Sequence, residues 1–216
     1  MPNIEVFIQR AILLLPPFFL AISLHESAHA YVAYRFGDPT AKNLGRITLN
    51  PLHHIDIMGL IVLLIARFGW AKPVPVNPNN LKNPRKDNIW ISLAGPASNF
   101  ILAIISALFF HLLAAILPPT TIGVYTLEMV RLSVILNIIL MVFNMLPLPP
   151  LDGYHILEGI VPHETYLKLQ QYKHIGPTIL LGLILMGWVF KFSVFSIIFS
   201  PFIRILGGLL LGSSNL

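Results

Sequence analysis

The chain of 216 residues contains no cysteine, which excludes disulfides, thiolate metal ligands and a cysteine nucleophile together. Charged side chains are also scarce: Lys, Arg, Asp and Glu make up 11% of the residues, against roughly 25% in a soluble domain. Hydrophobic residues make up 56%, and the mean hydropathy is +0.77. This composition predicts a membrane protein with one transmembrane domain over residues 1–216.

Acidic residues are fewer than basic ones, nine against 14, which gives a net charge of +5. In a soluble protein this excess would suggest a nucleic-acid partner. Here the Lys and Arg residues lie in short polar stretches between apolar runs, the usual charge bias of membrane-protein loops. We therefore expect the lipid bilayer as the surroundings and no nucleic-acid partner.

Four apolar runs are long enough to cross a bilayer, at about residues 11–36, 88–117, 132–152 and 176–199. Residues 58–68 are apolar but too few to span, so we expect a re-entrant segment there. Residues 45–50 alternate like a short strand, and the prolines of residues 73–78 forbid a helix. The predicted fold is an all-α polytopic membrane protein of about four transmembrane helices, with short β-like extended stretches between the first two.

The first apolar run contains one charged side chain before Arg35, that of Glu26. A carboxylate at this depth is costly, so it indicates a functional site. His25 and His29 are four residues apart, which on a helix places both imidazoles on one face. This pattern predicts that the two histidines share a metal ion and that Glu26 acts on a metal-bound water.

A catalytic zinc takes three protein ligands and keeps one open position. The candidates for the third ligand are Asp152, Asp56, His54 and His155. If residues 58–68 turn back, the first and third spans run in parallel, and Asp152 lies at the depth of the two histidines. We therefore favour Asp152, which follows a proline-rich helix break.

The same count of crossings places the basic loops on one side and the uncharged residues 118–126 on the other. Because basic loops stay in the cytoplasm, we expect a multi-pass protein of the cell membrane. Its N-terminus would be external and its active site would open toward the cytoplasm.

Four motifs together resemble the site-2 protease family of intramembrane zinc metalloproteases, in the short form without PDZ or CBS domains. They are His25-Glu26-Ser27-Ala28-His29, Ala94-Gly95-Pro96, the segment 69–78, and the run from Asn144 through Pro147, Pro149 and Pro150 to Leu151-Asp152-Gly153. The resemblance implies that His25, His29 and Asp152 bind one Zn²⁺ per chain and that Glu26 is the general base.

The resemblance also implies regulated intramembrane proteolysis: hydrolysis of peptide bonds in or near the transmembrane segments of membrane-protein substrates. Asn144 matches a polar residue that the family keeps before its Asp-Gly pair, whereas residue 57 lacks the expected proline. Nothing in the sequence requires an oligomer or excludes one.

Further site residues are expected around this centre. Asn144 and His54 are candidates for stabilising the transition state, and His155 for orienting Asp152 or lining the entrance. The extended stretch with Lys72, Val74 and Val76 could bind an unwound substrate by strand addition. The alternative is a non-catalytic metal-binding membrane protein or carrier. A carrier needs ionisable residues on several spans, whereas here they collect at one depth, which favours the protease.

Overall fold

The computed structural model describes residues 4–66, 69–190 and 194–212. Within these ranges the protein is helical and contains no sheet, only one isolated antiparallel bridge between Ile55 and Ala71. The helices are α1 (Ile4–Arg35), α2 (Thr40–Asn43), α3 (Ile57–Ala66), α4 (Pro84–Ile116), α5 (Thr121–Asn144), α6 (Asp152–Ile160), α7 (His163–Tyr172), α8 (Gly176–Phe190), α9 (Val194–Phe202) and α10 (Gly208–Leu211). A π-helical stretch, Ile203–Gly207, joins α9 to α10.

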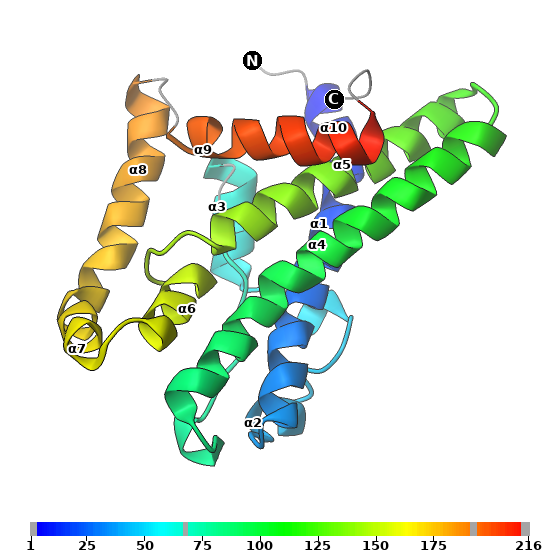
Figure 1. The fold of residues 1–216 in the computed structure, drawn as a ribbon. Helices are drawn as coiled ribbons and strands as arrows, with labels where there is room; N and C mark the ends of the chain where they lie inside the picture. Colours follow the sequence, from blue (N-terminus) through cyan, green and yellow to red (C-terminus); the bar gives the residue numbers. More distant parts are fainter. Residues whose placement is uncertain (1–3, 67–68, 191–193, 213–216) are drawn as a thin grey trace.

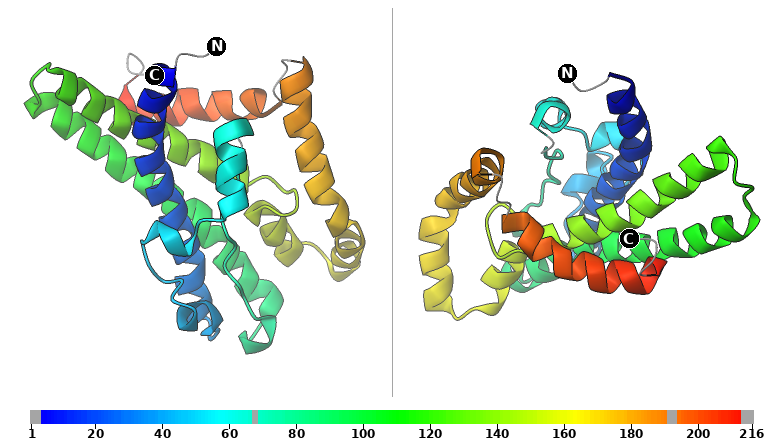
Figure 2. Two further views of the ribbon diagram at one scale, coloured as in Figure 1. Left: turned by 180° about the vertical axis from the view of Figure 1, so that it is seen from behind. Right: turned by 90° about the horizontal axis from the view of Figure 1, so that it is seen from above.

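The helices α4 and α5 form a long antiparallel hairpin, and α1 crosses it (Figure 1). Small residues such as Ala103 and Ala107 let α5 approach α4 closely, where Val134 and Ile138 are fully buried. The run from α9 to α10 lies across this hairpin and contributes Leu211 to the same core (Figure 1). The helix α8 stands apart, beyond α6 and α7 (Figure 2). The fold is therefore a three-helix centre with shorter helices around one side.

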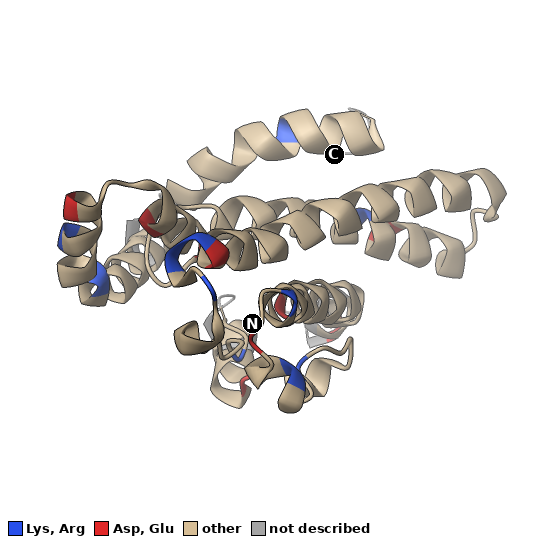
Figure 3. Ribbon diagram, turned by 60° about the horizontal axis from the view of Figure 1, so that its bottom comes forward, with Lys and Arg blue, Asp and Glu red and all other residues tan. Residues whose placement is uncertain are grey.

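Four helical stretches are long and apolar enough to cross a membrane: Ala11–Arg35, Pro84–Ile116, Thr121–Asn144 and Val194–Leu211. This confirms the predicted all-α membrane fold with four such helices. Figure 3 shows few charged residues along the long helices and most of them near the short helices and loops.

Two predicted spans differ from the helices. The third ends at Asn144 and not at residue 152, because Pro147, Pro149 and Pro150 cannot continue it. The fourth is predicted at residues 176–199, but α8 ends at Phe190 and the fourth candidate span is Val194–Leu211. Residues 191–193, inside the predicted span, lie outside the described residues. Hydropathy alone could not place this boundary, because both sides of it are apolar.

The residues between α1 and α4 also differ in part from the predicted strand and re-entrant segment. Residues 45–50 form a turn and bends and not a short strand. The run predicted to be re-entrant forms α3, whose ten residues are too few to span a bilayer. Its path relative to the membrane stays a prediction, and residues 67–68 of that run lie outside the described residues.

Residues 69–77, which we call the edge segment, are non-helical and held from one side. The backbone N–H of Lys72 donates to His54 O (2.8 Å), and the buried Arg46 guanidinium donates to Lys72 O (2.5 Å) and Pro73 O (3.0 Å). The edge segment is thus fixed without belonging to a sheet.

The far end of the edge segment is held by the buried carboxylate of Asp38. This group accepts hydrogen bonds from Asn77 N (2.7 Å), Asn80 Nδ2 (2.8 Å) and Thr40 Oγ1 (2.5 Å). Although burial alone would raise the pKa of the Asp38 carboxyl, these hydrogen bonds hold it below its usual value. The end of α1 is therefore joined directly to the edge segment.

Candidate metal centre

The two histidines of the first motif lie one turn apart on the buried face of α1, as their spacing predicted. Their rings meet edge to face with centroids 4.6 Å apart, and both side chains are buried. The two Nε2 atoms are 3.0 Å from each other. One face of a membrane-length helix thus presents two imidazole nitrogens to a single point.

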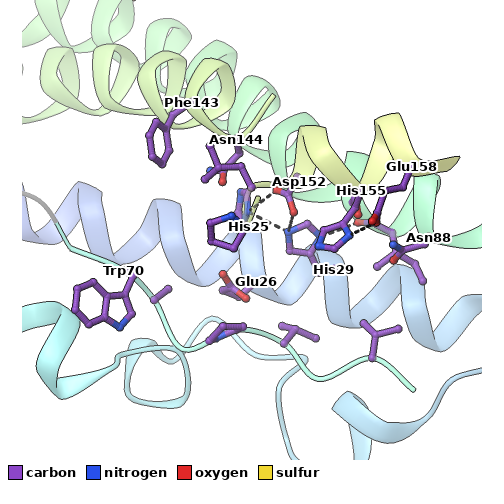
Figure 4. Close-up of a pocket in the computed structure, with 18 of the residues that line it drawn as sticks. His25, Glu26, His29, Trp70, Asn88, Phe143, Asn144, Asp152, His155 and Glu158 are labelled. Carbon is purple, nitrogen blue, oxygen red and sulfur yellow. Dashed lines mark hydrogen bonds and ion pairs between the residues drawn. The ribbon is translucent and has the colours of Figure 1, made fainter. Parts of the chain in front are cut away.

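Asp152 comes to this point as the first residue of α6. The chain turns sharply between α5 and α6, and a Cβ on Gly153 would lie 2.2 Å from Met145 O, so the turn requires glycine. Asp152 Oδ2 lies 3.2 Å from His25 Nε2, and Oδ1 lies 3.3 Å from His29 Nε2 (Figure 4). The structure therefore brings together the three residues that the sequence put forward as ligands.

The hydrogen bonds behind the histidines determine which nitrogen faces inward. His25 Nδ1–H donates to Asn99 Oδ1 (2.7 Å), and His29 Nδ1–H donates to Ile91 O (2.6 Å). In the neutral rings the Nε2 lone pairs then point at each other and at the Asp152 carboxylate. Asp152 Oδ2 is buried without a hydrogen-bond partner. Three electron-rich groups facing one another without a donor favour a bound cation.

The donor set fits zinc, which in one class of catalytic sites is bound by two imidazole nitrogens and one carboxylate oxygen. One ligand atom from each of His25, His29 and Asp152 lies within 4.8 Å of the others. The hydrogen bonds at Nδ1 also match the usual support of zinc-bound histidines, where the second nitrogen donates to an acceptor. Among the described residues, no other group of His, Asp and Glu converges in this way.

The helix α4 supports the centre through three residues spaced four apart. Ile91 and Asn99 supply the two acceptors, and Gly95 lies between them. A Cβ on Gly95 would lie 2.4 Å from His29 Nε2 and 2.6 Å from His25 Nε2. The Ala94-Gly95-Pro96 motif thus contains the one residue that lets α4 approach the ligands.

Asn99 is fully buried and every polar atom of its amide is used. Its Nδ2 donates to Asn137 Oδ1 (2.9 Å) and to Ala21 O (3.3 Å), and Asn137 Nδ2 donates in turn to Ser133 O (2.9 Å). This chain of hydrogen bonds joins α1, α4 and α5. The bond from Asn99 to His25 is not predicted by the sequence motifs; its available signal is an amide one turn after Gly95 inside an apolar span.

A cleft of about 970 Å³ opens beside the centre. The centre forms its floor, with Glu26 on the side of the edge segment and Asn144 and His155 on the side of α5 and α6 (Figure 4). Apolar side chains of α8, among them Leu180 and Ile184, line it further. A carboxylate therefore stands next to the ligands, in a space large enough for a peptide.

The remaining predicted site residues fall into two groups. Those that line the cleft are Asn144, His155, Val74 and Val76. His54 and Lys72 are not among its lining residues. The His54 ring is buried, with Nε2–H donating to Thr48 O (2.9 Å) and Nδ1 accepting from Arg46 Nη2 (3.5 Å), and burial lowers its pKa. In this structure His54 supports the edge segment.

Asp56, another candidate for the third ligand, accepts a hydrogen bond from Gly59 N (2.9 Å) at the start of α3. It therefore stabilises a helix terminus.

Comparison with known proteins identifies the family. The chain is 44% identical over 168 residues to the "Putative zinc metalloprotease YwhC" of Bacillus subtilis, covering 73% of each chain. It is 34% identical over 198 residues to the "Putative zinc metalloprotease Rip2" of Mycolicibacterium smegmatis, covering 84% of this chain and 74% of that protein. Identity to the "Zinc metalloprotease MJ0392" of Methanocaldococcus jannaschii is 27%, over 86% of this chain and 45% of that protein.

The chain belongs to the site-2 protease family. No family model and no solved structure matches it. As a site-2 protease family member, the chain is a zinc metalloprotease of the membrane, and His25, His29 and Asp152 are its candidate zinc ligands.

The close approach of α4 gives a test of the centre. We expect Gly95→Ala to lose most of its zinc, because the added methyl group would occupy the space against both Nε2 atoms. Alanine favours a helix over glycine by about 1 kcal/mol, so helix propensity cannot cause the loss. Gly182→Ala in α8 is the matched control, since a Cβ there meets nothing within 4 Å. Metal analysis of the purified proteins decides, and full zinc content in Gly95→Ala would contradict the packing described.

Proposed function

We propose that the protein is an intramembrane zinc endopeptidase that hydrolyses peptide bonds in or near the transmembrane segments of membrane-protein substrates. The observation that carries the proposal is the position of the metal centre inside α1, a membrane-length helix. His29 precedes Arg35, the last residue of that helix, by six residues, or about 9 Å. A substrate must therefore reach the centre from within or close to the bilayer.

Zinc held by the three ligands would supply a Lewis acid that polarises the scissile carbonyl and activates a water. Glu26 lines the cleft next to both histidines and would take the proton of the attacking water. It would then return that proton to the leaving amine as the C–N bond breaks. Asn99 and Ile91 would keep the histidines in their binding orientation throughout.

Binding requires that the substrate first unwinds, because a helix hides its peptide bonds. The edge segment supports this step: Val74 and Val76 line the cleft, and among the described residues their N–H groups have no hydrogen-bond partner. Pro73 and Pro75 have no N–H, and Arg46 holds the Lys72 and Pro73 carbonyls from behind. An unwound substrate would add to the free edge as a strand.

The charges support one orientation. The helix α2, which contains Lys42, and the start of α4, which contains Lys86, lie at one end of the molecule (Figure 1). The uncharged connection at residues 117–120 and the N-terminal end of α1 lie at the other. By the positive-inside rule the first end would face the cytoplasm of a cell-membrane protein, and the cleft would open toward it.

The separate tasks of base and ligand can be tested at the first motif. Glu26→Gln should keep its zinc but lose cleavage of a membrane-embedded substrate by at least about 100-fold, because a neutral amide cannot take the proton. His25→Ala should lose both. Zinc content and cleavage are measured on the same preparations in detergent or liposomes. Near wild-type cleavage by Glu26→Gln would rule out its role as base.

Strand addition predicts a specific sensitivity to proline. Val74→Pro removes an N–H that the substrate would use, so cleavage should fall about tenfold while zinc content stays intact. Val74→Ala is the control: it trims the side chain but keeps the N–H. If the two variants cleave equally fast, backbone pairing at this residue is not part of binding.

The orientation can be tested with topology reporters. Reporters inserted after Asn43 and after Asn83 should both read cytoplasmic, because the intervening α3 is too short to cross. A reporter inserted after Pro118 should read external. Opposite sides for the first two would mean that the segment between them spans the membrane and that the proposed topology is wrong.

A further inference from the structure

An unwound peptide has two polar edges, and the edge segment can pair with only one of them. The other edge faces the opposite wall of the cleft, which is built by the end of α5 and by α6 (Figure 4). In water-poor surroundings an unpaired backbone N–H is costly, so that wall needs a hydrogen-bond acceptor. A role for this second wall in holding substrate rests on the proposed function.

His155 is the group on that wall held most firmly from behind. It follows Asp152 by three residues on α6, so both side chains face the cleft. His155 Nδ1 lies 3.0 Å from Glu158 Oε2, and Gln170 Nε2 donates to the other carboxylate oxygen, Oε1, at 2.6 Å. The Glu158 side chain is 8% exposed and that of His155 is 28% exposed. A buried, doubly hydrogen-bonded carboxylate thus orients a half-exposed imidazole.

The orientation of the ring leaves its other nitrogen as an acceptor. Because the Glu158 carboxylate accepts, Nδ1 carries the proton, and the neutral ring keeps a lone pair on Nε2. Among the described residues no protein group pairs with His155 Nε2. Figure 4 shows the ring beside Asp152 and His29, across the centre from Glu26.

The helix that carries His155 is also fixed at its far end. Arg85 of α4 donates from Nε to Glu158 O (2.8 Å) and from Nη2 to Val161 O, so it binds a carbonyl in the last turn of α6 and the carbonyl of the residue after that helix. Gly159 of α6 packs closely against Ile89 of α4: a Cβ added to Gly159 would lie 2.1 Å from Ile89 Cγ1. The position of Nε2 is therefore set before any substrate enters, which lowers the entropy lost on binding.

We propose that His155 Nε2 accepts a hydrogen bond from a backbone N–H of the unwound substrate, on the edge turned away from the edge segment. His155 is then a substrate-binding residue, and Glu158 and Gln170 are positioning residues that hold its ring. The two walls together hold the scissile bond over the centre, the edge segment from one side and His155 from the other.

The test removes single N–H groups from the substrate. A synthetic transmembrane substrate is prepared with an ester in place of one amide at each successive position around the cleavage site. With wild-type enzyme, kcat/KM should fall about tenfold at the position that pairs with His155, the factor expected for one lost hydrogen bond. With His155→Leu the all-amide substrate should be cut about tenfold more slowly, and the ester at that position should cost nothing further.

Controls separate this pairing from a general loss of structure. Zinc content of His155→Leu should equal that of the wild type, since His155 is not a ligand. Esters at positions that pair with the edge segment should lower kcat/KM by the same factor in both enzymes. Glu158→Leu should weaken the ester effect at the His155 position, and Glu158→Gln, which keeps an oxygen for Nδ1–H, should restore it.

Ester effects of equal size at every position in wild type and His155→Leu would overturn the inference and leave the proposed function intact. A wild-type enzyme that cuts no transmembrane substrate would overturn both.

Discussion

The structure depends on keeping three mutually repelling groups together inside a membrane-length bundle. The lone pairs of His25 and His29 and the Asp152 carboxylate converge within 4.8 Å. Without a cation this is unfavourable, and it persists because each group is held from behind. The histidines are held by acceptors on α4, and the aspartate by the turn that starts α6. Zinc held by these three residues would replace the repulsion with attraction, so metal binding and the packing of α1, α4 and α6 would stabilise each other.

The helix α4 is the element on which this arrangement relies most. Ile91, Gly95 and Asn99 are spaced four apart and lie on one face of α4, as His25 and His29 do on α1. Asn99 therefore meets His25, and Ile91 meets His29. Glycine in the middle permits the approach, and the outer two residues orient the rings. The chain through Asn137 extends this support into α5, where a buried amide is tolerated because all its hydrogen bonds are made.

Features that depend on local spacing and depth could be predicted from the sequence. The two histidines on one face and the carboxylate of Glu26 beside them are of this kind, as are the depth of Asp152, which follows from the count of crossings, and an all-α membrane fold. Contacts between distant segments could not be predicted: nothing local indicates that Asn99 bonds His25, that Arg46 holds the edge segment, or that Glu158 holds His155. The division between α8 and α9 was not predicted, because the residues before it and after it, 176–190 and 194–202, are both apolar. The hydrogen bonds of His54 to Thr48 and Arg46 could not be predicted either, because a histidine in a loop gives no sign of whether it binds a neighbour or a substrate.

The non-helical backbone of this protein lies where a membrane protein can tolerate it, beside the cleft. Within a membrane, non-helical chain is tolerated only where it is buried in protein or lines a cavity. Here the two irregular stretches around the centre, the edge segment and residues 145–151, lie on opposite sides of the cleft. The edge segment has the N–H groups of Val74 and Val76, unpaired among the described residues, and residues 145–151 lead into α6, which carries the proposed acceptor His155. A helix entering between them could exchange its internal hydrogen bonds for these two walls, at the point where the zinc ligands and Glu26 meet. The features that make the cleft costly to build are thus those that would let it hold an unwound helix under the proposed function.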